Sequence, residues 1–302
     1  MNHKPLGQTA IELPEIGLGT WDYRAGPAPL RAGLDAGALF IDTAESYGSE
    51  SVVAEAIRGL RESVLLATKV SRNHLRPAEV LAAAEQSLRR LRTDWIDLYQ
   101  IHEPNPAVPL EETLGAMEEL VDAGKVRFIG VSNFSVHELE RARQKMRKHP
   151  IVSNQVRYNL ADRSIEGGLL AYCRARDITV IAYSPLGREL QRLRDCDPHG
   201  ILTEVAREVG KNVPQVALNW CLYHDGVVAI PKGNSIGHVL DNCGASGWRL
   251  SAGQFRQLDE GILSRRRTRV DSLLRRLVPN RAGPFLKKCI RRLPSTLRRK
   301  LN

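Results

Sequence analysis

Several features that define other classes of protein are missing from this chain of 302 residues. It has no run of eighteen apolar residues, so we expect no membrane-spanning helix. Residues 1–10 lack the apolar core of a secretory signal. The 5 cysteines include no Cys-x-x-Cys pair, which argues against a disulfide framework or a cysteine-rich zinc site and favours a reducing cytosol. The remaining composition, 42% hydrophobic and 26% charged, is that of an ordinary globular protein, and we expect it to be cytoplasmic.

Acidic residues are almost absent from the end of the chain. Residues 264–302 hold 14 Lys and Arg but one acid, Asp271, for a net charge of +13, which leaves 30 bases and 33 acids, net −3, in residues 1–263. We therefore predict two parts: a mildly acidic globular domain over 1–263 and a basic amphipathic C-terminal extension over 264–302.

The extension repeats apolar residues at helical spacing between its bases, in two short pieces separated by prolines. Such segments bind anionic membrane surfaces, so we predict peripheral membrane association. Docking against the globular part or a partner, and a solvated tail, are the alternatives. We expect no nucleic acid partner, because aromatic residues for base stacking are nearly absent here.

The globular part alternates apolar runs with amphipathic stretches. The runs are continuous, as in buried parallel strands: 16–18, 38–41, 64–70, 95–101, 126–131, 151–156, 178–183 and 227–230. Helical patterns lie between them: 30–37, 50–60, 77–91, 109–123, 135–148, 166–176, 213–223 and 236–245. About eight even alternations predict a (β/α)₈ TIM barrel; a doubly wound sheet also alternates but fits this even spacing less well.

Two segments fall outside this alternation. Residues 4–15, with Gly7 and Pro14, are predicted to form an N-terminal β-hairpin that closes the barrel floor. The stretch 186–211, between the seventh strand and its helix, is long enough to be functional or to contain an extra helix.

Polar residues stand at the carboxyl ends of three consecutive predicted strands, where a barrel carries its active site. Asp42 ends the second strand and Tyr47 follows it, Lys69 lies at the end of the third, and His102 follows the fourth. Individually they have structural explanations: a helix cap, a packed ring, a core histidine. Lys69 has no such simple structural explanation, because a buried ammonium needs a partner. Asp42 on the adjacent strand is the natural candidate for that partner.

These four residues suit the reduction of a carbonyl group. Hydride addition to an aldehyde or ketone yields the alcohol only when the developing alkoxide is protonated. The ordinary tyrosine pKa of about 10 is high for that task, and a neighbouring ammonium lowers it. We therefore predict Tyr47 as the proton donor, assisted by Lys69 and Asp42, with His102 orienting the carbonyl oxygen.

In these residues the sequence resembles the aldo-keto reductase superfamily over about residues 4–262. The segments that carry the resemblance, in chain order, are GLGTW at 17–21, FIDTAESYG at 40–48, ATKV at 67–70, DLYQIH at 97–102, GVSNF at 130–134, NQV at 154–156, AYSPLG at 182–187 and IPK at 230–232. The resemblance implies a barrel, a nicotinamide cofactor extended over its mouth, and Asp42, Tyr47, Lys69 and His102 as the catalytic residues.

The resemblance also implies the cofactor contacts. Ser132, Asn133 and Gln155 match residues that bind the nicotinamide carboxamide, and Tyr183 matches the ring that stacks on it. Thr20 matches a position at the mouth and Trp21 one in the substrate pocket. The pyrophosphate loop is expected at Ser184, Leu186 and Gly187. Taken singly, these residues would also fit strand-end caps, packed aromatics and a turn.

At the adenosine end the chain departs from the family pattern, which is Pro-Lys-Ser/Thr, an Arg six residues after the Lys, and then Glu-Asn. Lys232 is present, but Gly233 replaces the hydroxyl residue, His238 the arginine, and Asp241-Asn242 the Glu-Asn. A 2′-phosphate would lose a hydroxyl donor and a permanent planar cation. We predict NADPH as cofactor, held by Lys232, Asn234, His238 and Asn242, with NADH less strongly excluded.

Glu103 follows His102 where many relatives have an aromatic residue, and we expect it to alter the rim of the substrate pocket.

Two other kinds of site, a metal site and a Rossmann dinucleotide site, are disfavoured. Neighbouring strand residues face opposite ways, so His102-Glu103 predicts no metal site. Gly17-Leu18-Gly19 lacks the third glycine of a Rossmann fingerprint.

The predicted function is that of an NADPH-dependent aldehyde or ketone reductase. A nicotinamide-binding, redox-sensing regulatory subunit with slow turnover is the alternative, and an alcohol or sugar dehydrogenase is the same reaction run in reverse. The sequence specifies neither the substrate nor the oligomeric state.

Overall fold

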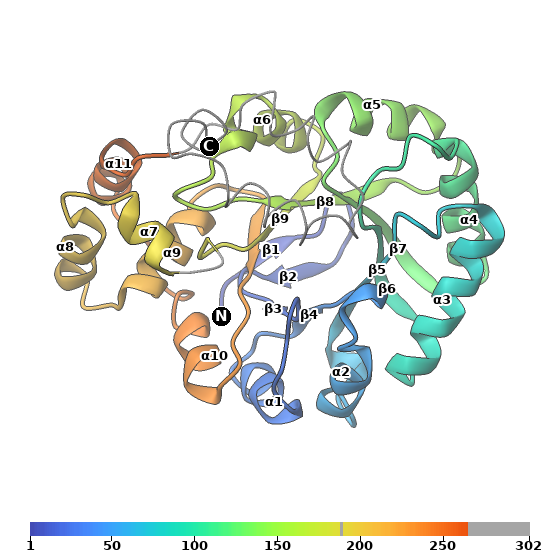
Figure 1. The fold of residues 1–302 in the computed structure, drawn as a ribbon, viewed down its shortest axis with the longest axis horizontal. Helices are drawn as coiled ribbons and strands as arrows, with labels where there is room; N and C mark the ends of the chain where they lie inside the picture. Colours follow the sequence, from blue (N-terminus) through green and yellow to red (C-terminus); the bar gives the residue numbers. More distant parts are fainter. Residues whose placement is uncertain (188–189, 265–302) are drawn as a thin grey trace, which may run out of the picture. The chain divides into compact units, whose positions relative to one another are not determined.

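The computed structural model describes residues 1–187 and 190–264. Within them, eight parallel strands form one sheet in the order β10-β9-β8-β7-β6-β5-β4-β3, and the helices follow one another around it (Figure 1). The predicted TIM barrel is confirmed. The basic extension, from Arg265 onward, lies outside the described residues.

The strands begin and end close to the predicted apolar runs. Their bounds are β3 Leu18–Gly19, β4 Phe40–Asp42, β5 Leu65–Val70, β6 Ile96–Ile101, β7 Val126–Ser132, β8 Ile151–Arg157, β9 Thr179–Tyr183 and β10 Val227–Ile230. The helices are α1 Pro27–Asp35, α2 Glu50–Ala56, α3 Pro77–Leu91, α4 Leu110–Asp122, α5 Val136–Lys145, α6 Leu169–Arg174, α7 Leu190–Asp195, α8 Ile201–Glu208, α9 Val213–Leu222, α10 Ile236–Cys243 and α11 Ala252–Gly261.

The barrel closes between its first and last strands. Ile16 forms a parallel bridge with Ala229, and the Gly17 and Gly19 amides donate to the backbone oxygens of Ala229 and Pro231 at 2.8 and 3.0 Å. Closure satisfies edge groups that an open sheet would leave unpaired.

The predicted hairpin is present and lies against the barrel interior. It consists of β1 His3–Pro5 and β2 Glu12–Pro14. Leu6 and Leu13 are fully buried among inward-facing strand residues such as Phe40 and Leu98. Lys4 is also buried, and its ammonium donates to the backbone oxygens of Leu222, His224 and Val227 at 2.5, 2.9 and 2.8 Å. The hairpin therefore fills one end of the barrel and joins it to the end of α9.

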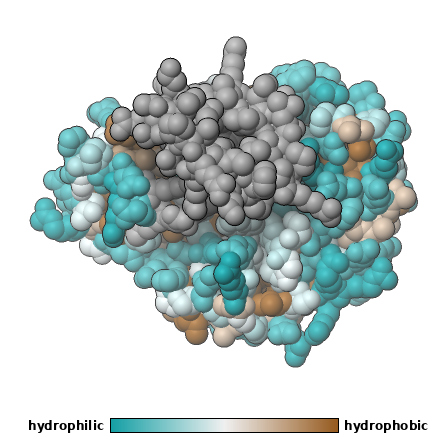
Figure 2. Space-filling view, viewed as in Figure 1, coloured by the Kyte–Doolittle hydropathy of each residue, from teal (hydrophilic) through white to brown (hydrophobic). Residues whose placement is uncertain are grey.

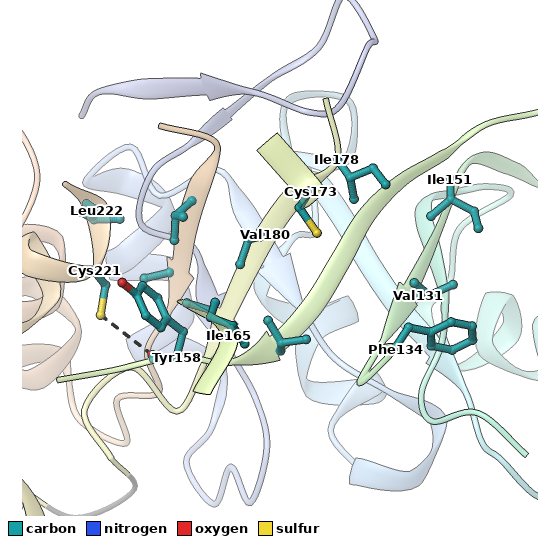
Figure 3. Packing of buried hydrophobic residues seen from close by; sticks show 14 of the residues in the cluster. Val131, Phe134, Ile151, Tyr158, Ile165, Cys173, Ile178, Val180, Cys221 and Leu222 are labelled. Atoms are coloured by element: carbon teal, nitrogen blue, oxygen red, sulfur yellow. Dashed lines mark hydrogen bonds between the residues drawn. The ribbon is translucent and has the colours of Figure 1, made fainter. Parts of the chain in front are cut away.

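A second apolar layer lies between the strands and the helices. Figure 3 shows part of it: Val131, Ile151 and Val180 from the strands meet Phe134, Ile165 and Cys173 from the segments that cover them. Each fully buried Val, Leu, Ile or Phe side chain contributes roughly 1.5–3 kcal/mol relative to an exposed one. This packing holds the strand ends, and so the site they carry, in fixed positions.

Two helical segments differ from the predicted pattern, and a third agrees with it. The stretch 166–176 is split, because Gly168 has a φ of 138° between a 3₁₀ turn at Ser164–Gly167 and α6. The long stretch 186–211 contains α7 and α8, as expected of an extra helical insertion. Helix α11 was not predicted; it begins at a Ser251 cap, and its Phe255 stacks on Trp220 with ring centroids 5.9 Å apart.

On the described surface in Figure 2, side chains are mostly hydrophilic, with scattered apolar patches. Among the described helices, none combines the length and apolar character needed to cross a membrane.

Candidate active site

The four predicted catalytic residues come from three adjacent strands of the barrel. Asp42 ends β4, Lys69 is the penultimate residue of β5, and His102 follows β6. The strands pair in parallel, with Asp42 opposite Ala67 and Lys69 opposite Gln100. Tyr47 ends the 3₁₀ turn Glu45–Tyr47, which closes at Gly48 in the left-handed conformation (φ 72°). The expectation that these residues meet at one mouth is confirmed.

Lys69 and Asp42 form a buried ion pair. Nζ of Lys69 lies 2.6 Å from Oδ2 of Asp42 and 2.7 Å from the backbone oxygen of Thr43, and the two residues are 0% and 2% exposed. Burial is the largest influence on the pKa of Lys69 and lowers it, whereas the Asp42 carboxylate opposes that shift. The carboxylate is therefore what keeps a cation at this position.

Tyr47 lies between this cation and His102. Nζ of Lys69 is 4.9 Å from the centroid of the Tyr47 ring, and the Tyr47 hydroxyl is 3.4 Å from Nε2 of His102. The Tyr47 and His102 rings meet edge to face, with centroids 5.4 Å apart. One hydroxyl thus lies within reach of an imidazole and beside a fixed positive charge.

His102 is a neutral imidazole over the whole physiological range. Burial, and then the nearby Lys69 cation, lower its pKa to about 3. A neutral imidazole has one N–H donor and one acceptor nitrogen. His102 can therefore donate a hydrogen bond to a carbonyl oxygen without carrying a charge itself.

The residues predicted to hold the nicotinamide form a polar network at the ends of β7, β8 and β9. Asn133, with a φ of 63°, donates to Ser132 Oγ and to the backbone oxygen of His102 at 3.0 and 3.1 Å. Its Oδ1 accepts from the Tyr183 hydroxyl at 2.9 Å. Gln155 donates to Oδ1 of Asp42 at 2.6 Å. The structure brings these residues together and joins them to Asp42.

The chemistry of this donor set fits a nicotinamide. A carboxamide needs both donors and acceptors, and the hydroxyl of Ser132 with the amides of Asn133 and Gln155 offers both. The Tyr183 side chain is partly exposed beside them. Thr20 contributes differently: it is fully buried, and its hydroxyl donates to the Asp42 backbone oxygen at 3.0 Å.

The predicted phosphate-binding residues lie on the loops after β9 and β10. Ser184 and Gly187 both have positive φ, 48° and 73°, and the Gly187 amide donates to the Ser184 backbone oxygen at 2.9 Å. Leu186 packs against the core. Beyond β10, Lys232 is partly exposed, Asn234 and His238 are exposed, and Asn242 is buried in α10.

Charged side chains and an indole follow the strands around the site. Glu103 lies 3.6 Å from Arg72, which follows β5, and Trp21, after β3, is 47% exposed. Glu45 accepts hydrogen bonds from the Ser71 amide and from His74 Nδ1, the latter at 3.1 Å. The residues around the site are thus partly polar.

Three residues around Asp42 and Lys69 were not singled out from the sequence. Gln100 donates to Oδ1 of Asp42 at 3.2 Å, and Thr43 contributes a backbone oxygen to Lys69. Glu50, 1% exposed, accepts from Thr68 at 2.7 Å and opposes the lowering of the Lys69 pKa. A polar residue inside the apolar run 95–101 was the signal that could have revealed Gln100.

Within residues 1–187 and 190–264, no group of three or more His, Cys, Asp or Glu side chains is placed to hold a metal ion.

The chain is similar to known reductases. Methylglyoxal reductase YeaE of Escherichia coli (strain K12) is 38% identical over 260 residues, which cover 83% of this chain and 91% of that protein. Glyoxal reductase of Bacillus subtilis (strain 168) is 35% identical over 255 residues, covering 82% and 89%.

Solved structures give the same result. An aldo-keto reductase from Klebsiella pneumoniae in complex with NADPH superposes with a TM-score of 0.81 at 41% identity, over 88% of this chain and 98% of that one. The family model described as "Aldo/keto reductase family" matches residues 15–262. The chain therefore belongs to the aldo/keto reductase family and is an oxidoreductase.

Proposed function

We propose that this protein reduces small aldehydes and ketones to alcohols with NADPH, and that Tyr47 is the proton donor. The observation that carries the proposal is the buried Lys69–Asp42 pair beside the Tyr47 ring and His102. The Lys69 ammonium is 0% exposed, and a buried ammonium is costly unless it is paired. Here the Asp42 carboxylate keeps it charged next to the Tyr47 phenol.

The residues that would hold the cofactor are Ser132, Asn133, Gln155 and Tyr183 at the nicotinamide and Lys232 at the phosphate end. When bound, the nicotinamide supplies the hydride for the carbonyl carbon. Tyr47 gives its hydroxyl proton to the carbonyl oxygen, so that an aldehyde becomes a primary alcohol and a ketone a secondary one. The phenolate left on Tyr47 is stabilised by the Lys69 cation and regains its proton from solvent.

His102 and Asp42 play supporting parts. The neutral His102 imidazole, 3.4 Å from the Tyr47 hydroxyl, donates to the same carbonyl oxygen and orients it toward that hydroxyl. Asp42 holds Lys69 in place and is itself fixed by Gln100 and Gln155. Rigid support of this kind keeps the reacting groups in position without reorganisation.

The substrates that we propose are small 2-oxoaldehydes. Two relatives at 38% and 35% identity are named for the reduction of methylglyoxal and glyoxal. The rim charges Arg72 and Glu103, 3.6 Å apart, suit compact and polar carbonyl compounds better than long apolar ones. Both relatives are named as reductases, and no observation favours a redox-sensing regulatory subunit.

The direct test measures NADPH oxidation at 340 nm against methylglyoxal, glyoxal, simple ketones and aldoses, and repeats it with NADH. We expect turnover with at least one 2-oxoaldehyde and faster turnover with NADPH. Tyr47→Phe is the matched control, because any activity that survives it does not come from this site. Absence of turnover with every carbonyl compound, in protein that binds the cofactor, would contradict the proposal.

We also propose that residues 264–302 form a separate extension that binds anionic membrane surfaces. The charge contrast supports it: +13 in the extension against −3 in residues 1–263. A basic residue near an anionic surface contributes about 1 kcal/mol, and salt screens that attraction. Sedimentation with phosphatidylserine vesicles at low and high salt tests it, and indifference to vesicles at low salt would overturn it.

A further inference from the structure

An aspartate held between two cations joins the loop after β3 to the loop after β10. Oδ1 of Asp22 accepts from Nε and Nη2 of Arg24 at 3.1 and 3.0 Å. Nζ of Lys232 donates to the backbone oxygen of Asp22 at 3.0 Å and lies 3.8 Å from its Oδ2. Two positive side chains from opposite ends of the barrel's strand order thus converge on one carboxylate.

The same two loops are tied together elsewhere, so the cations have a defined position. The Arg24 amide donates to Oδ1 of Asn234 at 3.3 Å, and the Gly19 amide donates to the Pro231 backbone oxygen. The side chains themselves remain open to solvent: Arg24 is 78% exposed and Asp22 43%. Exposed ion pairs contribute little to stability, so a stronger anion can take the place of this carboxylate.

The neighbouring positions cannot supply the usual contacts to a 2′-phosphate. A Cβ on Gly233 would lie 2.7 Å from Cγ2 of Val239 and 3.0 Å from its amide nitrogen. The loop is therefore packed too closely against α10 for a serine or threonine to enter unchanged. His238, in place of the arginine, lacks the planar fork that binds a phosphate through two parallel hydrogen bonds.

We propose that Arg24 and Lys232 bind the 2′-phosphate of NADPH, and that Asp22 sets the affinity by competing for both cations. Arg24 replaces the arginine that the family has at position 238, and its guanidinium approaches the phosphate from the loop after β3. The inference rests on the proposed function, because it concerns the cofactor of that same site. In the free protein Asp22 occupies the position of the anion; in the complex the phosphate displaces it.

Asp22 offers an unusually clean variant. Its φ is 52°, in the left-handed region that Asn tolerates as readily as Asp. Asp22→Asn therefore keeps the turn and the size of the side chain while it removes the charge. Arg24→Gln removes the cation, and Arg24→Lys keeps the charge but loses the fork.

A second arginine–aspartate pair provides the matched control. Asp35 on α1 lies 3.7 Å from Nε of Arg31, and both side chains are exposed. Asp35 is at the opposite end of α1 from the loop that carries Asp22. Asp35→Asn and Arg31→Gln repeat the same changes of charge away from the proposed phosphate site.

The experiment measures dissociation constants by calorimetry on the full chain, without turnover, for NADP⁺ and NAD⁺ and for 2′,5′-ADP and 5′-AMP. We expect Arg24→Gln to weaken NADP⁺ and 2′,5′-ADP by about tenfold, with NAD⁺ and 5′-AMP changed less than twofold. Arg24→Lys should lie between Arg24→Gln and the wild type. Asp22→Asn should tighten NADP⁺ and 2′,5′-ADP about threefold or more at low salt, and less at high salt. The control variants should change none of the constants.

Two results separate the failure of this inference from the failure of the proposed function. If the wild type binds NADP⁺ but the Arg24 and Asp22 variants change NADP⁺ and NAD⁺ equally, or change neither, the 2′-phosphate lies elsewhere and the inference is overturned. If the wild type binds neither dinucleotide, the proposed function and the inference fall together. Melting temperatures within about 2 °C of the wild type establish that each variant is folded.

Discussion

Replacement of Asp42 by Asn should both destabilise the protein and stop catalysis. Oδ2 of Asp42 accepts a hydrogen bond from Lys69, and Oδ1 accepts hydrogen bonds from the Gln100 and Gln155 amides. All three donors are buried. Asn offers one acceptor oxygen where Asp offers two, and it provides no counter-charge. Burial would then lower the pKa of the Lys69 ammonium with Glu50, and no longer Asp42, opposing the shift.

The size of the effect follows from the burial of the pair. Removal of one partner from a buried ion pair costs about 3–5 kcal/mol. In a domain of this size each kcal/mol lowers the melting temperature by roughly 2–4 °C, so we expect a fall of roughly 6–20 °C. Loss of a properly assisted proton donor should lower kcat by about 10²-fold or more.

The assay combines thermal unfolding with NADPH oxidation, both at pH 7, with kinetics measured well below the lower melting temperature. Asp35→Asn is the control, because its pair with Arg31 is exposed and such pairs contribute at most about 1 kcal/mol. An Asp42→Asn protein that melts within about 2 °C of the wild type and keeps its turnover would refute the role given to this pair.

Four further predictions follow from the same structure. His102 has a pKa of about 3 in the folded chain and about 6.5 in the unfolded one, so the unfolded chain binds the extra proton and the unfolding free energy should fall as pH falls from 6.5 toward 3; His102→Gln should flatten this dependence in denaturant titrations, and an unchanged slope would contradict the neutral imidazole. Lys4→Met removes the Lys4 ammonium from three backbone carbonyl oxygens, two of them in buried hydrogen bonds, and should cost about 1–3 kcal/mol in urea unfolding; a neutral change would show that the hairpin does not depend on Lys4. A chain that ends at Ser264 keeps the buried Leu258 and Ile262 and should fold, reduce the same substrates and lose binding to anionic vesicles; an unfolded or inactive product would show that the two parts are not separable. His238→Arg adds a permanent planar cation at the start of α10 and should strengthen NADPH binding more than NADH binding in calorimetry; equal changes in both would mean that His238 does not face the 2′-phosphate.

The barrel could be predicted because its pattern is local. Continuous apolar runs such as 227–230 are typical of strands buried on both faces, and stops such as Gly124, with a φ of 71°, mark the ends of helices. Helix α11 escaped prediction because its burial depends on contacts with α8 and α9, such as Phe255 on Trp220. Those contacts join residues far apart in the sequence and leave a weak periodic signal.

The residues of the site also fall into those that could be predicted from the sequence and those that could not. Asp42, Lys69 and His102 were predictable because parallel strands bring their carboxyl ends to one edge, whatever the loops do. The pairing of Asp22 with Arg24 and Lys232 was not, because it depends on two loops separated by some two hundred residues and on the left-handed φ of Asp22. The close packing of Gly233 on Val239 likewise appears only once α10 is in place.

The most direct test of the whole account is the Tyr47→Phe variant, which removes one hydroxyl and leaves the ring that packs beside Lys69 and His102. We predict that NADPH binds with an unchanged dissociation constant while kcat for carbonyl reduction falls by about 10²-fold or more. Wild-type turnover in this variant would show that Tyr47 is not the proton donor and would contradict the central claim.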